Sequence, residues 1–352
     1  MRSFTRMALA AVASAGVVAG LTACTDNTSE EASTTNGTAS DDTLVIYSGR
    51  DESLIAPLIE KFEDTTGITT EVRYGSTSEQ AQLLLTEGDN TPAEVFLSQE
   101  AGALGLVAEE GMLVELPGDV LDQVPSAFNS DDGHWVGLTG RARVVAYDGE
   151  EVTGEEAPDT LAEMVDPKWA GEIAIAPGNA SFLSFVTAIR VSEGEDAARD
   201  FLQKLKDNGV KTYQKNGDIL QAVNSGEVDL GLINHYYWYQ SAAEVGPENM
   251  RAQLKFGQPD DLAALVNVTG AGVLEQDAQD PQALEFIRFL LSEEGQAYFA
   301  GETYEYPLLK GAEGPEGVPA FDADANPDFD LSDLSSVDET AALIDEVGLT
   351  VN

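Results

Sequence analysis

The sequence predicts an α/β fold of two lobes, with two mixed sheets flanked by helices and joined by crossover strands. Strand-like and helix-like runs alternate from residue 43 to residue 97, and the same alternation resumes at residue 172. Two β-rich runs, 140–147 and 263–273, lie where the chain could pass between lobes. About 310 residues follow the polar N-terminal part, which is enough chain for two packed cores.

The first expected lobe opens with a short apolar run at residues 43–47 that stops at Ser48-Gly49, which predicts a buried strand entering a turn. Apolar residues at helical spacing over 54–62, with Gly67 as a stop, predict a helix. The next expected elements are a strand at 68–74, a helix at 77–86 and a strand at 93–97. This alternation is typical of parallel strands with helices packed on the sheet faces.

The second expected lobe repeats the pattern. In order, its expected elements are a strand at 172–176, helices at 182–191, 195–208 and 219–225, and a strand at 228–233. Two further helices are expected late in the chain, at 281–291 and 294–300. We therefore expect the first lobe to comprise residues 43–141 and 267–315, and the second lobe residues 142–266 and 316–352.

The N-terminus has the layout of a secretory signal. Two arginines precede an apolar run at residues 7–21 that is too short to span a bilayer comfortably. The run ends in Leu21-Thr22-Ala23-Cys24, which resembles the lipobox at which bacterial lipoproteins are cleaved and lipidated. Cys24 is the only cysteine, so it has no internal disulfide partner. We expect a signal peptide at 1–23 and a lipid on Cys24; the alternative is a signal peptide that ends near a free cysteine.

Residues 24–42 predict a flexible tether, because almost none of their side chains could be buried in a core. The expected location is therefore extracytoplasmic, with the folded part held at the cell membrane by lipid. The formal charge is −45, from 63 acidic and 18 basic residues. Such a charge argues against nucleic acid and anionic lipid surfaces as partners. Diffuse acidity by itself indicates a solvated surface rather than a binding site.

The strongest local signal is a pair of adjacent tyrosines, Tyr236 and Tyr237, which follow a strand-like run. In a continued strand the two rings would point to opposite faces, whereas in a helix they could splay toward one point. Phenol oxygens have a free pKa of about 10, so only a highly charged cation holds them ionised at neutral pH. Ferric iron meets that demand, whereas calcium and magnesium prefer carboxylates, carbonyls and water. The alternative is an aromatic cluster in the core or in a sugar-binding wall.

Six motifs in order resemble those of the bacterial periplasmic ferric-ion-binding proteins, which are the solute receptors of iron(III) ABC importers. The likeness runs from about residue 44 to residue 309. The motifs are Tyr47-Ser48-Gly49-Arg50, Pro92-Ala93-Glu94-Val95-Phe96, Gly140-Arg141-Ala142-Arg143-Val144, Gln214-Lys215-Asn216, Asn234-His235-Tyr236-Tyr237-Trp238 and Glu305-Tyr306-Pro307-Leu308. The resemblance implies a type II periplasmic-binding-protein fold, in which two lobes close over the solute.

The resemblance also implies a set of iron ligands, which this chain matches in part. Tyr236 and Tyr237 match the paired tyrosines of the family. Asp51 stands where many members have a histidine, and Gln99, with Glu100 beside it, stands where some have a glutamate. A further tyrosine used by some members is Phe182 here. Asp51, Gln99 and Glu100 are therefore candidate ligands only.

The family binds its iron with a synergistic anion, carbonate or phosphate. The loop before an expected helix would bind this anion, because backbone N–H groups at a helix start suit negative charge. Arg141 could hold the anion by a forked contact and lower the pKa of the tyrosines; the alternative for Arg141 and Arg143 is an interlobe salt bridge. His235 is expected to be a structural neighbour of the tyrosines. The anion-binding residues implied by the resemblance are Arg141, Asn179, Ala180, Ser181 and Asn216.

The implied protein is a monomeric receptor that carries ferric iron to a membrane permease and makes or breaks no covalent bond. Its expected partners are the ABC permease, ferric iron and, through Cys24, membrane lipid. One alternative is the same fold binding another small solute, such as a sugar, a polyamine or an oxyanion. A second alternative is a surface lipoprotein that recognises another protein or acts as an enzyme, although no catalytic triad is visible in the sequence.

Overall fold

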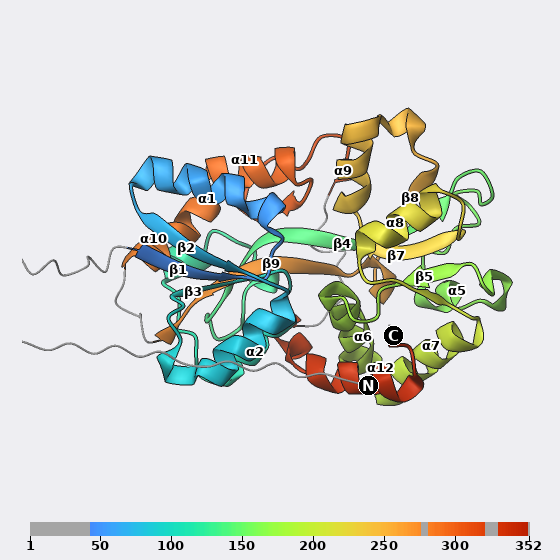
Figure 1. The fold of residues 1–352 in the computed structure, drawn as a ribbon, viewed down its shortest axis with the longest axis horizontal. Coiled ribbons are helices and arrows are strands. Elements are labelled where there is room, and N and C mark those ends of the chain that lie inside the picture. The colour runs from blue at the N-terminus through green and yellow to red at the C-terminus, as the bar shows by residue number, and fades with distance from the viewer. Residues whose placement is uncertain (1–42, 276–280, 321–329, 351–352) are drawn as a thin grey trace, which may run out of the picture. The chain divides into compact units, whose positions relative to one another are not determined.

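A computed structural model describes residues 43–275, 281–320 and 330–350 of the chain. The predicted signal peptide at 1–23, the lipid site at Cys24 and the tether at 24–42 lie outside these residues. The folded part, shown in Figure 1, contains parallel and antiparallel strands and helices, so the α/β prediction is confirmed. Within the described residues, none of the helices combines the length and the apolar character needed to cross a membrane.

The first lobe is built on a mixed sheet in the order β2-β1-β3-β9-β4. Strand β1 is parallel to β2 and β3, whereas β9 runs antiparallel to β3 and β4. The sheet forms where the sequence is apolar: Leu44 and Ile46 of β1 are completely buried. Its strands are β1 (Thr43–Ser48), β2 (Thr69–Tyr74), β3 (Val95–Ser98), β4 (Val136–Asp148), β9 (Val266–Val273) and β10 (Tyr306–Pro307), which pairs with β4.

The second lobe uses the other half of β4. Strand β4 pairs with β9 up to Ala142 and with β7 from Arg143 onward, so it passes from one sheet to the other between these residues. Figure 1 shows β4 and β9 running together between the two halves. The lobe boundary expected after residue 141 stays a prediction. The remaining strands of the second sheet are β5 (Ile173–Ile175), β6 (Lys211–Thr212), β7 (Leu230–Asn234) and β8 (Ala252–Phe256).

Helices cover both faces of the first sheet, with α1 and α11 on one side and α2 on the other (Figure 1). Helix α1 ends at Gly67, whose φ of 77° lies in the left-handed region that favours glycine. Phe62 of α1 packs edge-on against Phe286 of α10, with ring centroids 5.1 Å apart, and joins these two helices. The helices here are α1 (Glu52–Thr66), α2 (Thr77–Glu87), η1 (Gly88–Asn90), α3 (Ala101–Glu109), α4 (Gly118–Leu121), η2 (Ser126–Phe128), α10 (Pro281–Leu290) and α11 (Glu293–Glu302).

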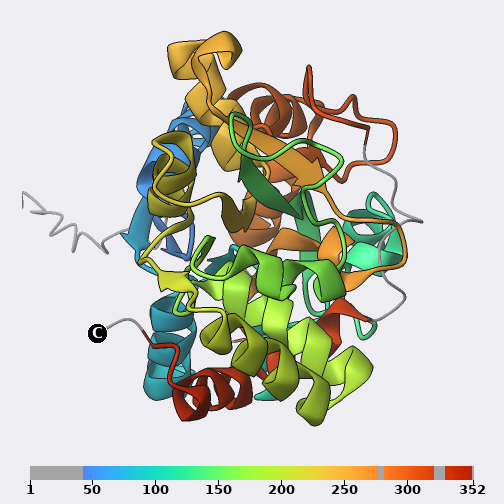
Figure 2. The same cartoon turned by 90° about the vertical axis from the view of Figure 1, so that its right-hand side faces the viewer.

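The longest described helix of the second lobe is α6, which packs beside α7. Figure 2 looks onto this lobe and shows α12, in red, beside the yellow-green helices. The helices are α5 (Leu161–Met164), η3 (Pro167–Trp169), α6 (Ala180–Glu193), α7 (Glu195–Asp207), α8 (Asn216–Asn224), α9 (Tyr236–Val245), η4 (Pro247–Asn249), η5 (Leu262–Ala264), η8 (Leu331–Ser335) and α12 (Val337–Val347).

The C-terminal residues correct the expectation that 316–352 belong wholly to the second lobe. Helix α12 does pack there, since Thr340 and Thr187 of α6 are hydrogen-bonded at 2.7 Å. The residues before it also contact the first lobe: the carbonyl of Pro319 accepts from Tyr306 at 3.0 Å, and Ser335 donates to Glu109 of α3 at 2.6 Å. The segment therefore spans both lobes, a placement that its own sequence pattern does not encode.

Candidate metal centre

A cavity of about 660 Å³ lies between the two lobes. Its walls are the loops that follow β1, β2, β3, β5 and β6, together with Tyr237 at the start of α9. In open α/β sheets ligands bind beyond the carboxyl ends of the strands, which is where these loops lie. The lining residues are 49–52, 74–79, Gln99, 178–180, Gln214, Lys215, Gly217, Asp218 and Tyr237.

Several helices begin at this cavity, which makes it favourable for negative charge. Helices α1, α2, α6 and α8 start within or next to its lining loops. The first turn of a helix has free N–H groups and the positive end of the helix dipole. The side chain of Asn179 caps α6 by accepting from the N–H of Ser181 at 3.1 Å. Helix starts on both lobes therefore favour an anionic or anion-bearing ligand in the space between them.

The tyrosine pair lies at the edge of the cavity because the chain turns from strand to helix at His235. Strand β7 ends at Asn234 and α9 begins at Tyr236. The rings of Tyr236 and Tyr237 are stacked, with centroids 4.4 Å apart and planes at 26°. Tyr236 is buried and Tyr237 lines the cavity. Of the two geometries that the sequence left open, the structure has the helical one, in which the rings lie together.

Burial raises the pKa of Tyr237 well above its usual value of 10. The neighbouring Tyr236 and the carboxylate of Asp51 act in the same direction, and the charge of Arg141 acts against them. The hydroxyl of Tyr237 therefore keeps its proton at neutral pH unless a strong positive charge replaces it.

Buried arginines supply positive charge behind the tyrosines. Arg50 binds Glu305 through two contacts, at 2.7 and 3.0 Å, and both side chains are about 1% exposed. Burial raises the pKa of Glu305, but the charge and hydrogen bonds of Arg50 outweigh it and hold that pKa below the usual range. Arg141 is buried beside this pair, with its Nε 3.9 Å from the Glu305 carboxylate. Arg50 is thus paired with a carboxylate, and Arg141 lies at longer range from the same group.

Arg143 makes its contacts with neutral groups of the second lobe. It donates to the carbonyl of Leu232 at 2.9 Å, to Ser181 Oγ at 3.3 Å and to Asn234 Oδ1 at 3.4 Å. Burial lowers the pKa of Arg143 to about 9. Among the described residues, the carboxylate that pairs with Arg141 belongs to its own lobe, so these contacts do not support the interlobe salt bridge considered for the two arginines.

The candidate carboxylate and amide ligands fall in different places. Asp51, at the start of α1, and Gln99, after β3, both line the cavity. Glu100 does not: it is buried, and its carboxylate accepts a hydrogen bond from Ser184 of α6 in the other lobe. Burial raises the pKa of Glu100 to about 7. The structure therefore argues against Glu100 as a ligand, because its side chain is buried against Ser184 and does not line the cavity.

The expected anion-binding residues form two layers. Asn179 and Ala180 line the cavity, whereas Ser181, Asn216 and Arg141 do not. Ser181 Oγ accepts from Asn216 Nδ2 at 3.1 Å and donates to Asn179 Oδ1 at 2.6 Å. Since Arg143 also donates to Ser181, this hydroxyl fixes the loop at the start of α6 rather than facing the cavity directly.

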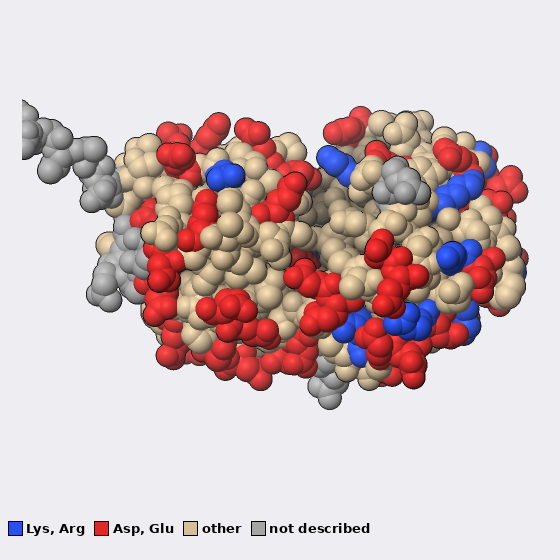
Figure 3. Space-filling view, turned by 60° about the horizontal axis from the view of Figure 1, so that its bottom comes forward, with Lys and Arg blue, Asp and Glu red and all other residues tan. Residues whose placement is uncertain are grey.

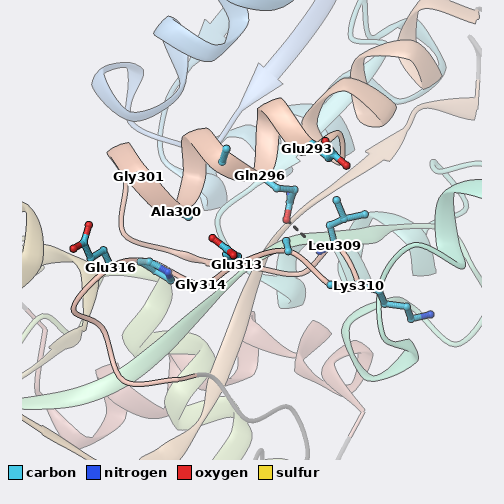
Figure 4. Close-up of a pocket in the computed structure, with 13 residues that line it drawn as sticks. Glu293, Gln296, Ala300, Gly301, Leu309, Lys310, Glu313, Gly314 and Glu316 are labelled. Atoms are coloured by element: carbon cyan, nitrogen blue, oxygen red, sulfur yellow. Dashed lines mark hydrogen bonds between the residues drawn. The ribbon is translucent and has the colours of Figure 1, made fainter.

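Within the residues that the structure describes, no group of three or more His, Cys, Asp or Glu side chains is arranged to hold a metal. A second cavity, of about 540 Å³, lies between α11 and residues 309–316 (Figure 4). Its central side chain, Gln296, is engaged by the backbone N–H groups of Leu308 and Leu309 at 2.9 and 3.1 Å. This cavity contains no tyrosine and lacks the convergence of helix starts, so it is the poorer candidate.

Two buried features were not assigned a role from the sequence: the Arg50–Glu305 pair and the contacts of His235. Burial lowers the pKa of His235 to about 4, so its ring is neutral at physiological pH. Arg50 and Glu305 both lie in motifs of the family resemblance, and their place in those motifs was the available signal. Their contact itself joins residues 255 positions apart, which no local pattern predicts.

Comparison with known proteins decides the family. A family model described as bacterial extracellular solute-binding protein matches residues 90–330. The chain belongs to this family. Among solute-binding proteins, the Fe(3+)-binding periplasmic protein of Serratia marcescens is 32% identical over 313 residues, which cover 88% of this chain and 92% of the relative. The major ferric iron-binding protein of Neisseria meningitidis is 32% identical over 316 residues, covering 87% and 93%.

A solved structure gives the same result. Iron-bound HitA from Pseudomonas aeruginosa matches this solute-binding protein with a TM-score of 0.82 at 33% identity, covering 87% of this chain and 99% of HitA. These findings confirm the resemblance to the ferric-ion-binding proteins and the type II periplasmic-binding-protein fold that it implied.

Proposed function

We propose that this solute-binding protein captures ferric iron together with a synergistic anion between its lobes and delivers it to the permease of an ABC importer. The observation that carries the proposal is the stacked pair of Tyr236 and Tyr237 at the cavity. Two phenolates would supply hard, anionic oxygen donors, and a trivalent cation is strong enough to displace their protons. The iron is the cargo in this proposal, so binding and release replace any chemical step and the protein is not an enzyme.

Tyr236 and Tyr237 are the proposed protein ligands, with Asp51 as the carboxylate best placed to add a third donor. Gln99 lines the cavity, but a neutral amide is a weak ligand for ferric iron. The remaining coordination positions would be filled by the anion, carbonate or phosphate. It would be held by Asn179 and Ala180 at the start of α6, supported from behind by Ser181, Asn216 and the charge of Arg141.

The wider proposal keeps the location expected from the N-terminus. The signal peptide at 1–23 would direct export, and lipid on Cys24 would hold the tethered receptor at the cell membrane, close to its permease. Closure would move the first lobe, 43–141 and 267–315, toward the second, 142–266, about the crossover strands β4 and β9. We propose that the receptor acts as a monomer, because its cavity uses residues from both lobes of one chain.

The double variant Tyr236→Phe, Tyr237→Phe tests the ligands. It keeps both rings and removes both hydroxyls, so the packing of α9 is preserved while the donors are lost. Even mutations of groups behind a metal ligand cost about 10- to 100-fold in affinity, so loss of two ligands should exceed about 100-fold. Iron affinity would be measured by competition with a chelator, and binding would be followed by the visible phenolate-to-iron absorbance.

Tyr239→Phe is the matched control, since Tyr239 lies on the same helix but does not line the cavity. It should keep both the colour and the affinity. A double variant that bound ferric iron tightly with unchanged absorbance would contradict the proposal. So would a purified wild-type protein that binds an organic solute and shows no affinity for iron by metal analysis.

A further inference from the structure

His235 lies at the point where β4 passes between the two sheets. Its side chain is completely buried. Its backbone N–H donates to the carbonyl of Ala142 at 3.0 Å, and its ring Nδ1 accepts from the N–H of Ala142 at 3.2 Å. Ala142 is the last residue of β4 that pairs with β9 in the first sheet. One side chain is thus bonded to the boundary residue of the crossover strand and is directly followed by Tyr236 and Tyr237.

The other ring nitrogen of His235 reaches the first lobe. Nε2 lies 2.8 Å from the carbonyl oxygen of Tyr304, in the segment between α11 and β10. Because Nδ1 accepts from Ala142, Nε2 carries the proton and donates it to this carbonyl. The imidazole also stacks on Tyr306 of β10, with centroids 4.7 Å apart and planes at 20°. The start of α9 is therefore attached to the first lobe through one ring.

Tyr304, whose carbonyl oxygen accepts this hydrogen bond from His235, has an unusual backbone conformation. Its φ is 58°, in the left-handed region that residues other than glycine seldom adopt. Its ring stacks on Tyr239 of α9 with centroids 6.0 Å apart, and Gln240 donates to the carbonyl of Thr303 at 3.4 Å. Three contacts, one from His235 and two from α9, thus hold residues 303–304 in place.

The same segment leads to the opposite wall of the cavity. Glu305 follows Tyr304 directly and binds Arg50, the residue before Asp51. A path of chain and side-chain contacts therefore connects the tyrosine pair, through His235, Tyr304, Glu305 and Arg50, to Asp51 across the cavity.

We propose that His235 is a positioning residue: by bonding both Ala142 and Tyr304, it sets the tyrosine pair at a fixed place relative to the first lobe. The inference rests on the proposed iron-binding function and adds a residue that governs how long the iron is held. Along the chain, the tyrosines follow directly from β7, which belongs to the second lobe. The hydrogen bond from His235 to Tyr304 is the link nearest to them in sequence that relates them to Asp51 and the other first-lobe groups at the cavity.

Two substitutions distinguish the two hydrogen bonds of the His235 ring, to Ala142 and to Tyr304. In His235→Asn, the side-chain oxygen takes the place of Nδ1, so the bond to Ala142 is kept and the bond to Tyr304 is lost. In His235→Gln, the longer side chain brings its amide N–H to the place of Nε2, so the bond to Tyr304 is kept. We expect His235→Asn to release iron about 10- to 100-fold faster than wild type, with a shifted phenolate-to-iron absorbance, and His235→Gln to restore both in large part.

Thr187→Val is the matched control for a general loss of stability. It removes the buried hydrogen bond between Thr187 of α6 and Thr340 of α12 at 2.7 Å, and neither residue lines the cavity. It should lower the unfolding midpoint without changing iron release or colour. Release would be measured by stopped-flow mixing of the iron-loaded, full-length chain with excess chelator, and the unfolding midpoint by circular dichroism.

The outcomes separate the inference from the function on which it rests. If His235→Asn releases iron at the wild-type rate with unchanged absorbance, His235 has only a structural role and the inference is wrong, while the proposed function stands. If His235→Asn does not fold, His235→Gln decides alone. Iron release at the wild-type rate from His235→Gln supports the bond to Tyr304. Release about 10- to 100-fold faster than from wild type overturns it. If wild type binds no iron with colour, both proposals fail.

Discussion

The phenol of Tyr237 is a group at this cavity whose protonation is affected by the fold. Burial raises its pKa well above 10, and the nearby Asp51 carboxylate adds to that effect. A group with a raised pKa holds its proton more firmly, so iron must displace that proton in order to bind. The positive charge of Arg141 acts the other way and lowers the cost of forming the phenolate.

We therefore expect iron affinity to rise with pH. Below the phenol pKa, each proton displaced makes the apparent affinity about tenfold stronger per unit increase in pH. The measurement is chelator competition between pH 6 and 8, together with proton release on loading a weakly buffered sample. The Tyr236→Phe, Tyr237→Phe variant provides the control, because it has no phenol protons to release there. An affinity independent of pH over this range would show that the phenols do not bind as phenolates.

At the scale of single elements, the decisive feature is where helices begin. Helix α9 begins directly after β7, and this turn is what brings two adjacent rings together. Helix α6 begins at the cavity and is capped by Asn179, whose side chain accepts from Ser181. A cap satisfies backbone N–H groups that the helix cannot, so the same residue contributes both to stability and to the shape of the proposed anion site.

Asn179→Ala should lower the free energy of unfolding by about 1 kcal/mol, the usual cost of losing a cap. Ser292→Ala is a matched control, because Ser292 caps α11 in the same way, accepting from Gly295 at 3.1 Å, and does not line the cavity. Both variants should lose similar stability in urea unfolding. Only Asn179→Ala should also weaken the dependence of iron binding on added carbonate or phosphate. Equal anion dependence in the two variants would exclude Asn179 from the anion site.

At the scale of the whole folded part, charge is distributed very unevenly. On the face shown in Figure 3, acidic side chains dominate the first lobe, whereas Lys and Arg gather on the second. In the interior near the cavity, by contrast, three positively charged side chains are buried: Arg50, Arg141 and Arg143. Buried charge needs a partner, and Glu305 provides it for Arg50 across 255 residues of sequence.

Breaking this pair should destabilise the protein strongly. In Glu305→Gln the buried Arg50 loses its counter-charge, which typically costs about 3–5 kcal/mol. Asp119→Asn is the surface control: its ion pair with Arg288 spans 3.0 Å, but the side chains are 64% and 42% exposed, so its loss should cost about 1 kcal/mol or less. Urea unfolding of both variants measures the difference. Similar losses would mean that Arg50 is compensated by other groups.

The local pattern of the sequence was sufficient for much of the framework. The strands at 43–47, 68–74 and 93–97 and the helices between them were predicted within a few residues, because burial on a sheet or helix face imposes a period on the chain. The late helices were equally legible, expected at 281–291 and 294–300 and found as α10 and α11. The strands β6, β8 and β10 and the helices α3, α4, α5 and α12 were not predicted.

The sequence by itself determined which residues could reach the cavity, since loops after parallel strands meet at one edge of a sheet. On that basis and by family resemblance it identified Tyr237, Asp51 and Asn179, which line the cavity, and Tyr236, which is buried beside Tyr237. Only the tertiary structure decided which neighbouring side chains actually face the cavity. Gln99 does and Glu100 does not, because Ser184, 84 residues away, binds the Glu100 carboxylate. His235 and Tyr304 likewise meet only after folding, since contacts between distant segments leave no period in the chain that encodes them.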